Sequence, residues 1–159
     1  MATEEISEEV TEVNTLLFQM QKGLMALPDI AVAEIVEFKT ATRENDEQAS
    51  WYIGKMEWRN TLVPVISFDQ RSGDDVELSD YKKVVVVNSV YQRDQHVYWA
   101  FLIDQAPRMQ HLNAKNLIAI EDAEANDVIA LQAESSGERL LFPNLEQIEV
   151  DIVEQEKLA

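Results

Sequence analysis

The sequence predicts a small all-β protein that ends in one short helix. Apolar residues come mostly in short runs rich in valine, isoleucine, leucine and aromatic side chains, separated by polar residues and glycines. This pattern is typical of many short strands joined by turns. After residue 143 the apolar period becomes helical, with Leu145, Ile148 and Ile152 following Asn144, a good helix N-cap. We therefore expect about ten strands in a closed or paired barrel arrangement, followed by an amphipathic helix.

The chain is expected to open with a hairpin. Residues 15–20 and 24–27 are apolar runs that flank a short polar connection, and Gly23 can supply the positive φ that a tight turn needs. Residues 29–38 fit either one or two helical turns or a distorted strand. Residues 40–50 are polar and lack a period, which predicts a surface loop.

A second hairpin is expected over residues 55–58 and 62–68. Asn60 suits its turn because a short amide side chain tolerates the left-handed region. Pro64 lies inside the second strand and cannot donate to a ladder hydrogen bond. We therefore expect that strand to lie at a sheet edge or to carry a bulge.

The second half of the chain continues as strands. Residues 84–87 are four consecutive valines, which predicts a strand buried on both faces, and residues 97–103 are its expected partner. Shorter strands are expected at residues 109–112, 118–120, 128–133 and 139–142. These elements, with no internal repeat, form one domain over residues 15–150, and residues 144–159 form the C-terminal helix and tail.

Composition and charge restrict the function. At 159 residues one domain is the default, and the absence of cysteine excludes disulfides and thiol chemistry. Residues 1–14 are acidic and contain no lysine or arginine, unlike a targeting peptide, and we expect them to be flexible. No apolar run reaches the roughly 18 residues of a membrane span. The net charge of −17 would repel nucleic acids and anionic lipids, so we expect a cytoplasmic protein without either partner.

Catalytic and cofactor sites have weak support. The two histidines, His96 and His111, have no second ligand at a recognisable metal spacing and no nucleophile motif beside them. Asp69 and Asp104 follow strands and are the best candidates for an acid–base pair in a small hydrolase, although such carboxylates more often cap turns. The four glycines are too far apart to form a phosphate loop. We expect no metal, no cofactor and no enzymatic activity.

A protein-binding surface is better supported. Trp51, Tyr52, Trp58 and Arg59 are residue types that dominate interface hot spots, and they lie within nine positions. Such a cluster is also common in cores, so it requires independent support.

That support comes from residues 54–68, which read Gly-Lys-Met-Glu-Trp-Arg-Asn-Thr-Leu-Val-Pro-Val-Ile-Ser-Phe. This segment resembles the central signature of CheW-like domains, in which a glycine is followed by an arginine five residues later and then by an apolar strand. The matching positions are Gly54, Arg59, Val63, Pro64, Val65 and Ile66. Further similarities at residues 24–28, 33–35, 84–88, 101–104 and 140–148 fall in the family's order, so the resemblance covers about residues 15–150.

The resemblance implies a fold of two packed five-stranded SH3-like β-barrels with a short C-terminal helix. Members of the family are adaptors without catalysis that couple methyl-accepting chemoreceptors to a CheA-type histidine kinase and associate with other CheW-like domains. By this resemblance, Arg59 and the groove near Gly54 would contact the receptor. The other expected protein-binding residues are Val32, Glu34, Trp58, Val63, Pro64 and Val65.

Some positions depart from the family pattern. Asn60 stands where a glycine is usual, Ser67 where an aspartate is usual, and Trp58 is larger than the usual leucine. A short, acidic, divergent domain resembles the accessory couplers of alternative chemosensory systems, including those of type IV pilus twitching. A paralogue that occupies array positions without activating the kinase is a further alternative.

Overall fold

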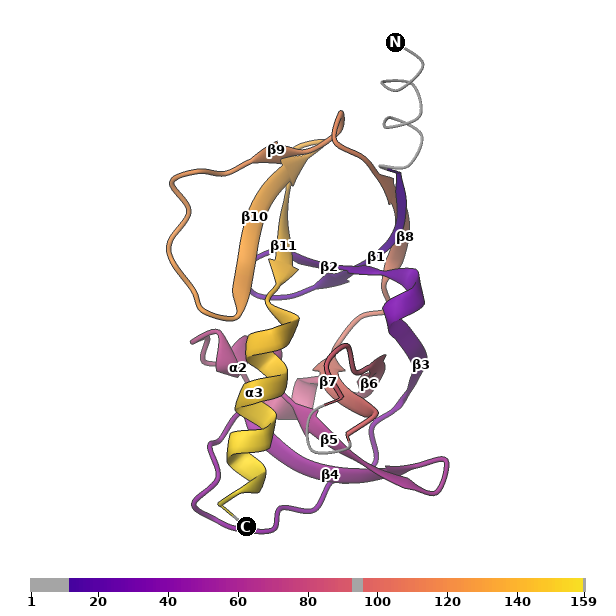
Figure 1. The fold of residues 1–159 in the computed structure, drawn as a ribbon, viewed down its shortest axis with the longest axis vertical. Helices are drawn as coiled ribbons and strands as arrows, with labels where there is room; N and C mark the ends of the chain where they lie inside the picture. Colours follow the sequence, from indigo (N-terminus) through magenta and orange to yellow (C-terminus); the bar gives the residue numbers. More distant parts are fainter. Residues whose placement is uncertain (1–11, 93–95, 159) are drawn as a thin grey trace.

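Two β-sheets and a C-terminal helix make up the computed structural model, which describes residues 12–92 and 96–158 (Figure 1). Most of the expected acidic leader, residues 1–14, lies outside the described residues. Its last two residues already belong to the first strand.

The first sheet combines the first two strands of the chain with the last four. Its strands lie in the order β8 (Arg108–Leu112), β1 (Val13–Gln19), β2 (Leu24–Pro28), β11 (Glu138–Pro143), β10 (Ile129–Ser135) and β9 (Ile118–Ala119). All neighbours are antiparallel except β2 and β11, which run parallel. The last strand of the chain, β11, therefore lies beside β2 in the middle of this sheet.

The second sheet uses the middle of the chain. Its order is β3 (Val32–Glu37), β6 (Lys83–Asn88), β7 (Tyr98–Ile103), β5 (Thr61–Ile66) and β4 (Tyr52–Trp58). Short helices lie between the strands: η1 (Asp29–Ala31), α2 (Phe68–Arg71) and η2 (Leu78–Asp80). The segment with two interpretations, residues 29–38, is both a helical turn, η1, and a strand, β3. The expected all-β architecture of two subdomains is confirmed. The first sheet has six strands where five were expected, and its short strand β9 lies within the strand predicted at residues 118–120.

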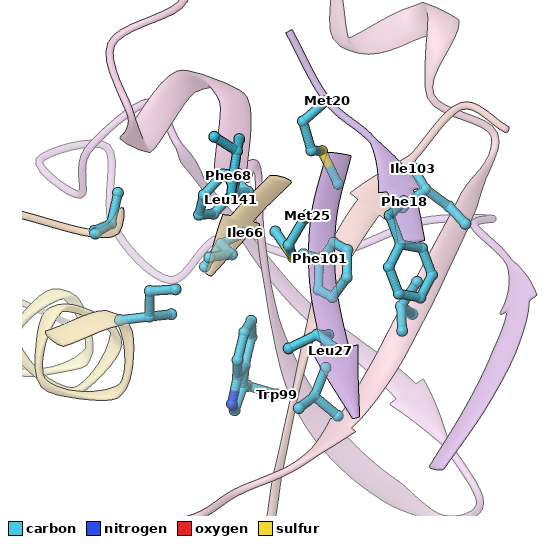
Figure 2. Packing of buried hydrophobic residues seen from close by; sticks show 14 of the residues in the cluster. Phe18, Met20, Met25, Leu27, Ile66, Phe68, Trp99, Phe101, Ile103 and Leu141 are labelled. Carbon is cyan, nitrogen blue, oxygen red and sulfur yellow. The ribbon is translucent and has the colours of Figure 1, made fainter. Parts of the chain in front are cut away.

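The main core lies between the two sheets and helix α3 (Leu145–Glu156). Phe18 of β1 packs edge-on against Phe101 of β7, with ring centroids 5.3 Å apart (Figure 2). The valine strand is buried on both faces, as predicted. Val85 and Val87 belong to this shared core, whereas Val84 and Val86 fill the interior of the second subdomain. Strand β6 therefore serves two cores at once.

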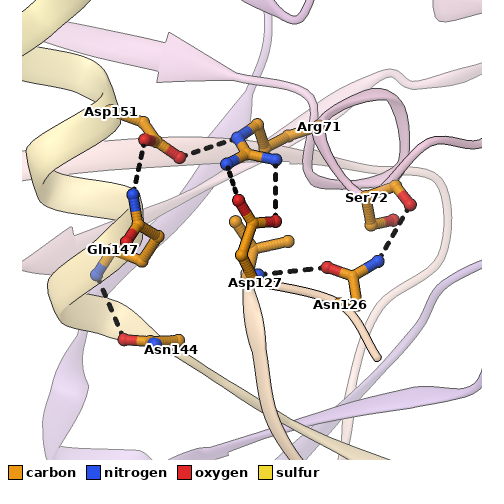
Figure 3. A network of polar contacts seen from close by, with 8 residues as sticks. Arg71, Ser72, Asn126, Asp127, Asn144, Gln147 and Asp151 are labelled. Atoms are coloured by element: carbon orange, nitrogen blue, oxygen red, sulfur yellow. Dashed lines mark hydrogen bonds and ion pairs between the residues drawn. The ribbon is translucent and has the colours of Figure 1, made fainter. Parts of the chain in front are cut away.

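Helix α3 begins where the sequence indicated. The Asn144 side chain accepts a hydrogen bond from the Gln147 backbone N–H at 3.1 Å, which satisfies one of the free donors of the first turn. A polar network then fixes the helix laterally: Arg71 of α2 donates to Asp151 of α3 and binds Asp127 with both terminal nitrogens (Figure 3). The network links α2, α3 and the β9–β10 connection.

The edge position expected for the strand with Pro64 is wrong. Strand β5 lies inside the sheet between β7 and β4, and the bulge lies opposite, in β4, between Tyr52 and Gly54. Pro64 is tolerated because pairing with β7 begins only at Val65. The proline, which has no N–H, therefore lies just before the residues of β5 that form hydrogen bonds with β7.

Candidate protein-binding site

A two-residue turn at the end of β4 positions the arginine of the family signature. Trp58 pairs with Thr61, so Arg59 and Asn60 form the turn, and both have positive φ, 49° and 60°. This is the backbone of a type I′ hairpin turn, whose twist matches that of the flanking strands. An arginine in this conformation is uncommon, and such residues persist where the surroundings hold them.

Two side chains, Glu34 and Trp58, hold Arg59 in place, and a third supports Trp58. Trp58 Nε1 donates to Glu34 Oε1 at 2.8 Å, and an Arg59 terminal nitrogen lies 3.3 Å from the same oxygen. The guanidinium carbon lies 4.7 Å from the centroid of the Trp58 ring, a cation–π contact. Tyr98 of β7 packs against the tryptophan in a T-shaped contact, with ring centroids 4.8 Å apart.

The cluster combines a fixed base with an accessible charge. Trp58 is 7% exposed, whereas the Arg59 side chain is 66% exposed. Glu34 occupies only part of the five N–H donors of the guanidinium. The remaining donors face solvent in a set orientation and can make directed hydrogen bonds to carboxylates or carbonyls of a partner.

Gly54 has a structural role beneath this surface. It is buried in β4 with a φ of 131°, and a Cβ at this position would lie 2.7 Å from the carbonyl oxygen of Thr42. The loop between β3 and β4 therefore crosses β4 directly over Gly54. Arg43 holds the loop there by donating to the carbonyls of Gln48, Ala49 and Tyr52.

The other expected contact residues divide by exposure. Glu34 is half-exposed in the cluster, and Val32 is half-buried at the start of β3. Val63 and Val65 are fully buried in the second subdomain, and Pro64 is buried under α3. The side chains of these three β5 residues are enclosed, so they support the surface from below.

Sequence reasoning missed Leu62, a large apolar side chain near the cluster. It is 63% exposed and pairs with Glu57 in the Arg59 hairpin. The apolar run 62–66 gave no sign that its first residue faces solvent, because the strands that cover the rest are distant in sequence. Ile30, 84% exposed on η1, was missed for the same reason.

The carboxylates proposed for hydrolysis occupy different environments. Asp69 is 2% exposed and accepts hydrogen bonds from the Tyr81 hydroxyl at 2.6 Å and from the Gln21 backbone N–H at 3.0 Å. Burial and then the bond to Asp69 raise the pKa of Tyr81 above its usual range. Asp104 is exposed. Asp69 therefore connects three segments of the fold, and the two carboxylates do not face a common cleft as a pair.

The two histidines lie apart and each faces a glutamate. His96 Nε2 is 2.7 Å from Glu156 at the end of α3, and His111 Nδ1 is 3.7 Å from Glu12. Over residues 12–92 and 96–158, no group of three or more His, Asp or Glu side chains is arranged to hold a metal ion. Within the same residues, no helix is both long and apolar enough to cross a membrane.

The comparisons with known proteins agree with the architecture. The family model of the CheW-like domain matches residues 14–151. Among solved structures, the chain is similar to the scaffolding protein TtCheW from Thermoanaerobacter tengcongensis, with a TM-score of 0.67 and 16% sequence identity over 84% of this chain and 89% of that chain. No curated protein sequence matches. Because the family model covers most of the sequence, the chain belongs to the CheW-like domain family.

Proposed function

We propose that the protein is a non-enzymatic cytoplasmic adaptor that couples chemoreceptors to a CheA-type histidine kinase. The observation that carries the proposal is the Glu34–Trp58–Arg59 cluster, an exposed guanidinium held in a fixed orientation on a CheW-like fold. The structural match to a protein described as a scaffolding protein supports it.

The cluster has the features of an interface hot spot. Tryptophan and arginine are enriched in hot spots, and the energy concentrates where a rigid anchor is surrounded by residues that exclude water. Trp58 and Glu34 remove much of the rotamer freedom of Arg59 before binding, so less entropy is lost on association. Leu62 adds exposed apolar surface in the same hairpin.

The departures from the family pattern preserve local geometry. Asn60 adopts the positive φ that the usual glycine would adopt. Ser67 is the N-cap of α2, and its hydroxyl accepts from the Gln70 N–H at 3.2 Å, a role that an aspartate also performs. Both replacements therefore fit a binding-competent hairpin and give no structural reason for loss of coupling.

The test measures binding of the purified protein to the regulatory domain of a CheA-type kinase and to a chemoreceptor cytoplasmic fragment. The Arg59→Ala variant is expected to bind at least one of them about 30-fold more weakly, the scale of a hot spot. Arg108→Ala is the matched control, because Arg108 is also exposed and paired with one glutamate, Glu138. Circular dichroism establishes that both variants are folded.

The outcomes separate the alternatives. Loss of binding in Arg59→Ala alone supports the proposal, whereas no binding of either partner by the wild type overturns it. A kinase assay with receptor present distinguishes a coupler, which changes kinase activity, from a paralogue that binds without activating. Repeating the assay with kinases of flagellar and type IV pilus systems would assign the pathway.

A further inference from the structure

A groove of about 540 Å³ lies beside the cluster, between strands β3 and β4. Its apolar walls are Val36 of β3 and Met56 and Trp58 of β4, which belong to the second subdomain's core or pack against it. Strands β3 and β4 are the two ends of the second sheet, so they face each other here without pairing. The groove is therefore the place where this barrel remains open.

Backbone N–H and C=O groups on the side of β4 away from β5 point toward this groove. Lys55 exchanges two hydrogen bonds with Thr42, at 2.9 and 3.0 Å, on the side of β4 away from β5. Backbone direction alternates along a strand, so the N–H and C=O of Glu57 point the same way as those of Lys55. The Thr42 bridge ends before Glu57, and no backbone partner for these groups occurs in the described parts of the chain.

The same alternation applies to β3. Phe38 donates its N–H to Lys82 at 2.9 Å, toward β6, so the backbone groups of Glu37 point away from β6. The groove thus has an unpaired edge on each side. Between the Thr42 bridge at Lys55 and the turn at Arg59, β4 offers room for about three residues of an added strand, at roughly 3.3 Å per residue.

The charged side chains beside the groove indicate what kind of segment it would bind. Glu37 and Glu57 are both exposed, and neither carboxylate forms an ion pair with a cation in residues 12–92 or 96–158. Two cations, Lys39 and Arg59, also line the groove, and Glu34 pairs with part of the Arg59 guanidinium. With a net charge of −17 for the whole chain, the edges favour a basic partner.

We infer that the groove between β3 and β4 binds an extended basic segment of a partner protein by strand addition to β4. Alternate backbone groups of the segment pair with Glu57. Its apolar side chains contact Val36 and Met56, and its lysine or arginine side chains reach Glu37 and Glu57. This binding mode goes beyond the proposed function, because it does not depend on a kinase or a receptor.

The experiment uses the full-length protein and a blocked hexapeptide of alternating valine and lysine, followed by amide NMR. In the free protein the Glu57 and Glu37 amides should exchange rapidly with solvent. Saturating peptide should slow exchange of the Glu57 amide by about tenfold or more, as expected when an exposed amide gains a hydrogen bond. A peptide of the same sequence with N-methylated backbone and one with glutamate for lysine should each bind at least about tenfold more weakly.

Charge variants complete the test. Glu57→Lys and Glu37→Lys should each weaken peptide binding, whereas Glu154→Lys, an exposed change on α3, should not. Equal binding of the N-methylated peptide, or an unchanged Glu57 amide, would overturn the inference. Slow exchange of this amide that appears with rising protein concentration alone would also overturn it, because a second copy would then occupy the groove. None of these results depends on the outcome with kinase or receptor.

Discussion

Arg71 Nε donates a hydrogen bond to Asp151 Oδ2 at 2.7 Å, and this bond ties α2 to the C-terminal helix (Figure 3). Both side chains are largely buried, 17% and 10% exposed. The Arg71→Met variant leaves Asp151 charged and short of a donor, with only Gln147 remaining. We expect the free energy of unfolding to fall by about 3 kcal/mol, measured by urea denaturation.

Arg108→Met is the control for this variant. Arg108 also pairs with a carboxylate, Glu138, but both side chains are exposed, 53% and 41%. Loss of this ion pair should lower the free energy of unfolding by less than about 1 kcal/mol, because exposed pairs are screened by solvent. Equal losses in the two variants would contradict the view that the Arg71 network holds α3.

Local features of the fold could be predicted from the sequence. The valine run, the Asn144 cap and the Asn60 turn each depend on neighbouring residues, and all three occur as expected. The interior position of β5 could not be predicted, because its partner at Val65 is Ala100, which lies far along the chain. Whether a strand lies at the edge or in the centre of a sheet depends on which distant strands pair with it. The sequence of the strand itself does not reveal those partners.

The candidate site shows the same limit. Arg59 and Glu34 were selected from the family resemblance, but nothing in the sequence indicated that one carboxylate would accept from both Trp58 and Arg59. This contact joins residues separated by 24 positions along the chain. The exposure of Leu62 also depends on packing rather than on residue type.

Asp127 should contribute acid sensitivity. The hydrogen bond from Arg71 lowers the pKa of Asp127 in the folded state. A depressed folded-state pKa stabilises the fold above the unfolded-state pKa, and this contribution is lost as pH falls through the folded-state pKa. Asp127→Asn should therefore show a smaller drop in unfolding free energy than the wild type between about pH 5 and pH 2.

Urea titrations across that pH range measure the effect. Asp122→Asn serves as the control, because Asp122 is exposed and makes no hydrogen bond or ion pair with the described side chains. Its pH profile should follow the wild type. Superimposable profiles for Asp127→Asn and wild type would contradict the prediction.

Gly54→Ala should destabilise the protein more than Gly73→Ala. Both glycines have positive φ, 131° and 101°, so both substitutions strain the backbone. Only at Gly54 would the new Cβ also lie within 3 Å of backbone atoms, those of Thr42 and Arg43, and nothing lies within 4 Å at Gly73. Thermal unfolding should show a cost of about 1 kcal/mol at Gly73 and at least about twice that at Gly54. Similar costs would mean that the crossing loop can move away.

Trp58→Phe tests the bond that positions Arg59, and Trp99→Phe is its matched control. Both tryptophans are buried, at 7% and 2% exposure, so each substitution creates a similar cavity. Trp58 Nε1 bonds Glu34, whereas Trp99 Nε1 is buried without an acceptor among the described side chains. Removing the indole N–H therefore costs a hydrogen bond to a charged group at Trp58 and relieves an unsatisfied donor at Trp99.

A double-mutant cycle with Glu34→Gln separates that bond from the cavity. The cavity term is common to the single and double variants, so the coupling energy reports only the contact between the two side chains. We expect about 1 kcal/mol between Trp58→Phe and Glu34→Gln, and additivity within about 0.5 kcal/mol between Trp99→Phe and Glu34→Gln. Coupling should also appear in partner binding, because Glu34 holds Arg59 through the same oxygen. Additive effects for Trp58 and Glu34 would show that the bond between the indole N–H and the carboxylate contributes nothing measurable.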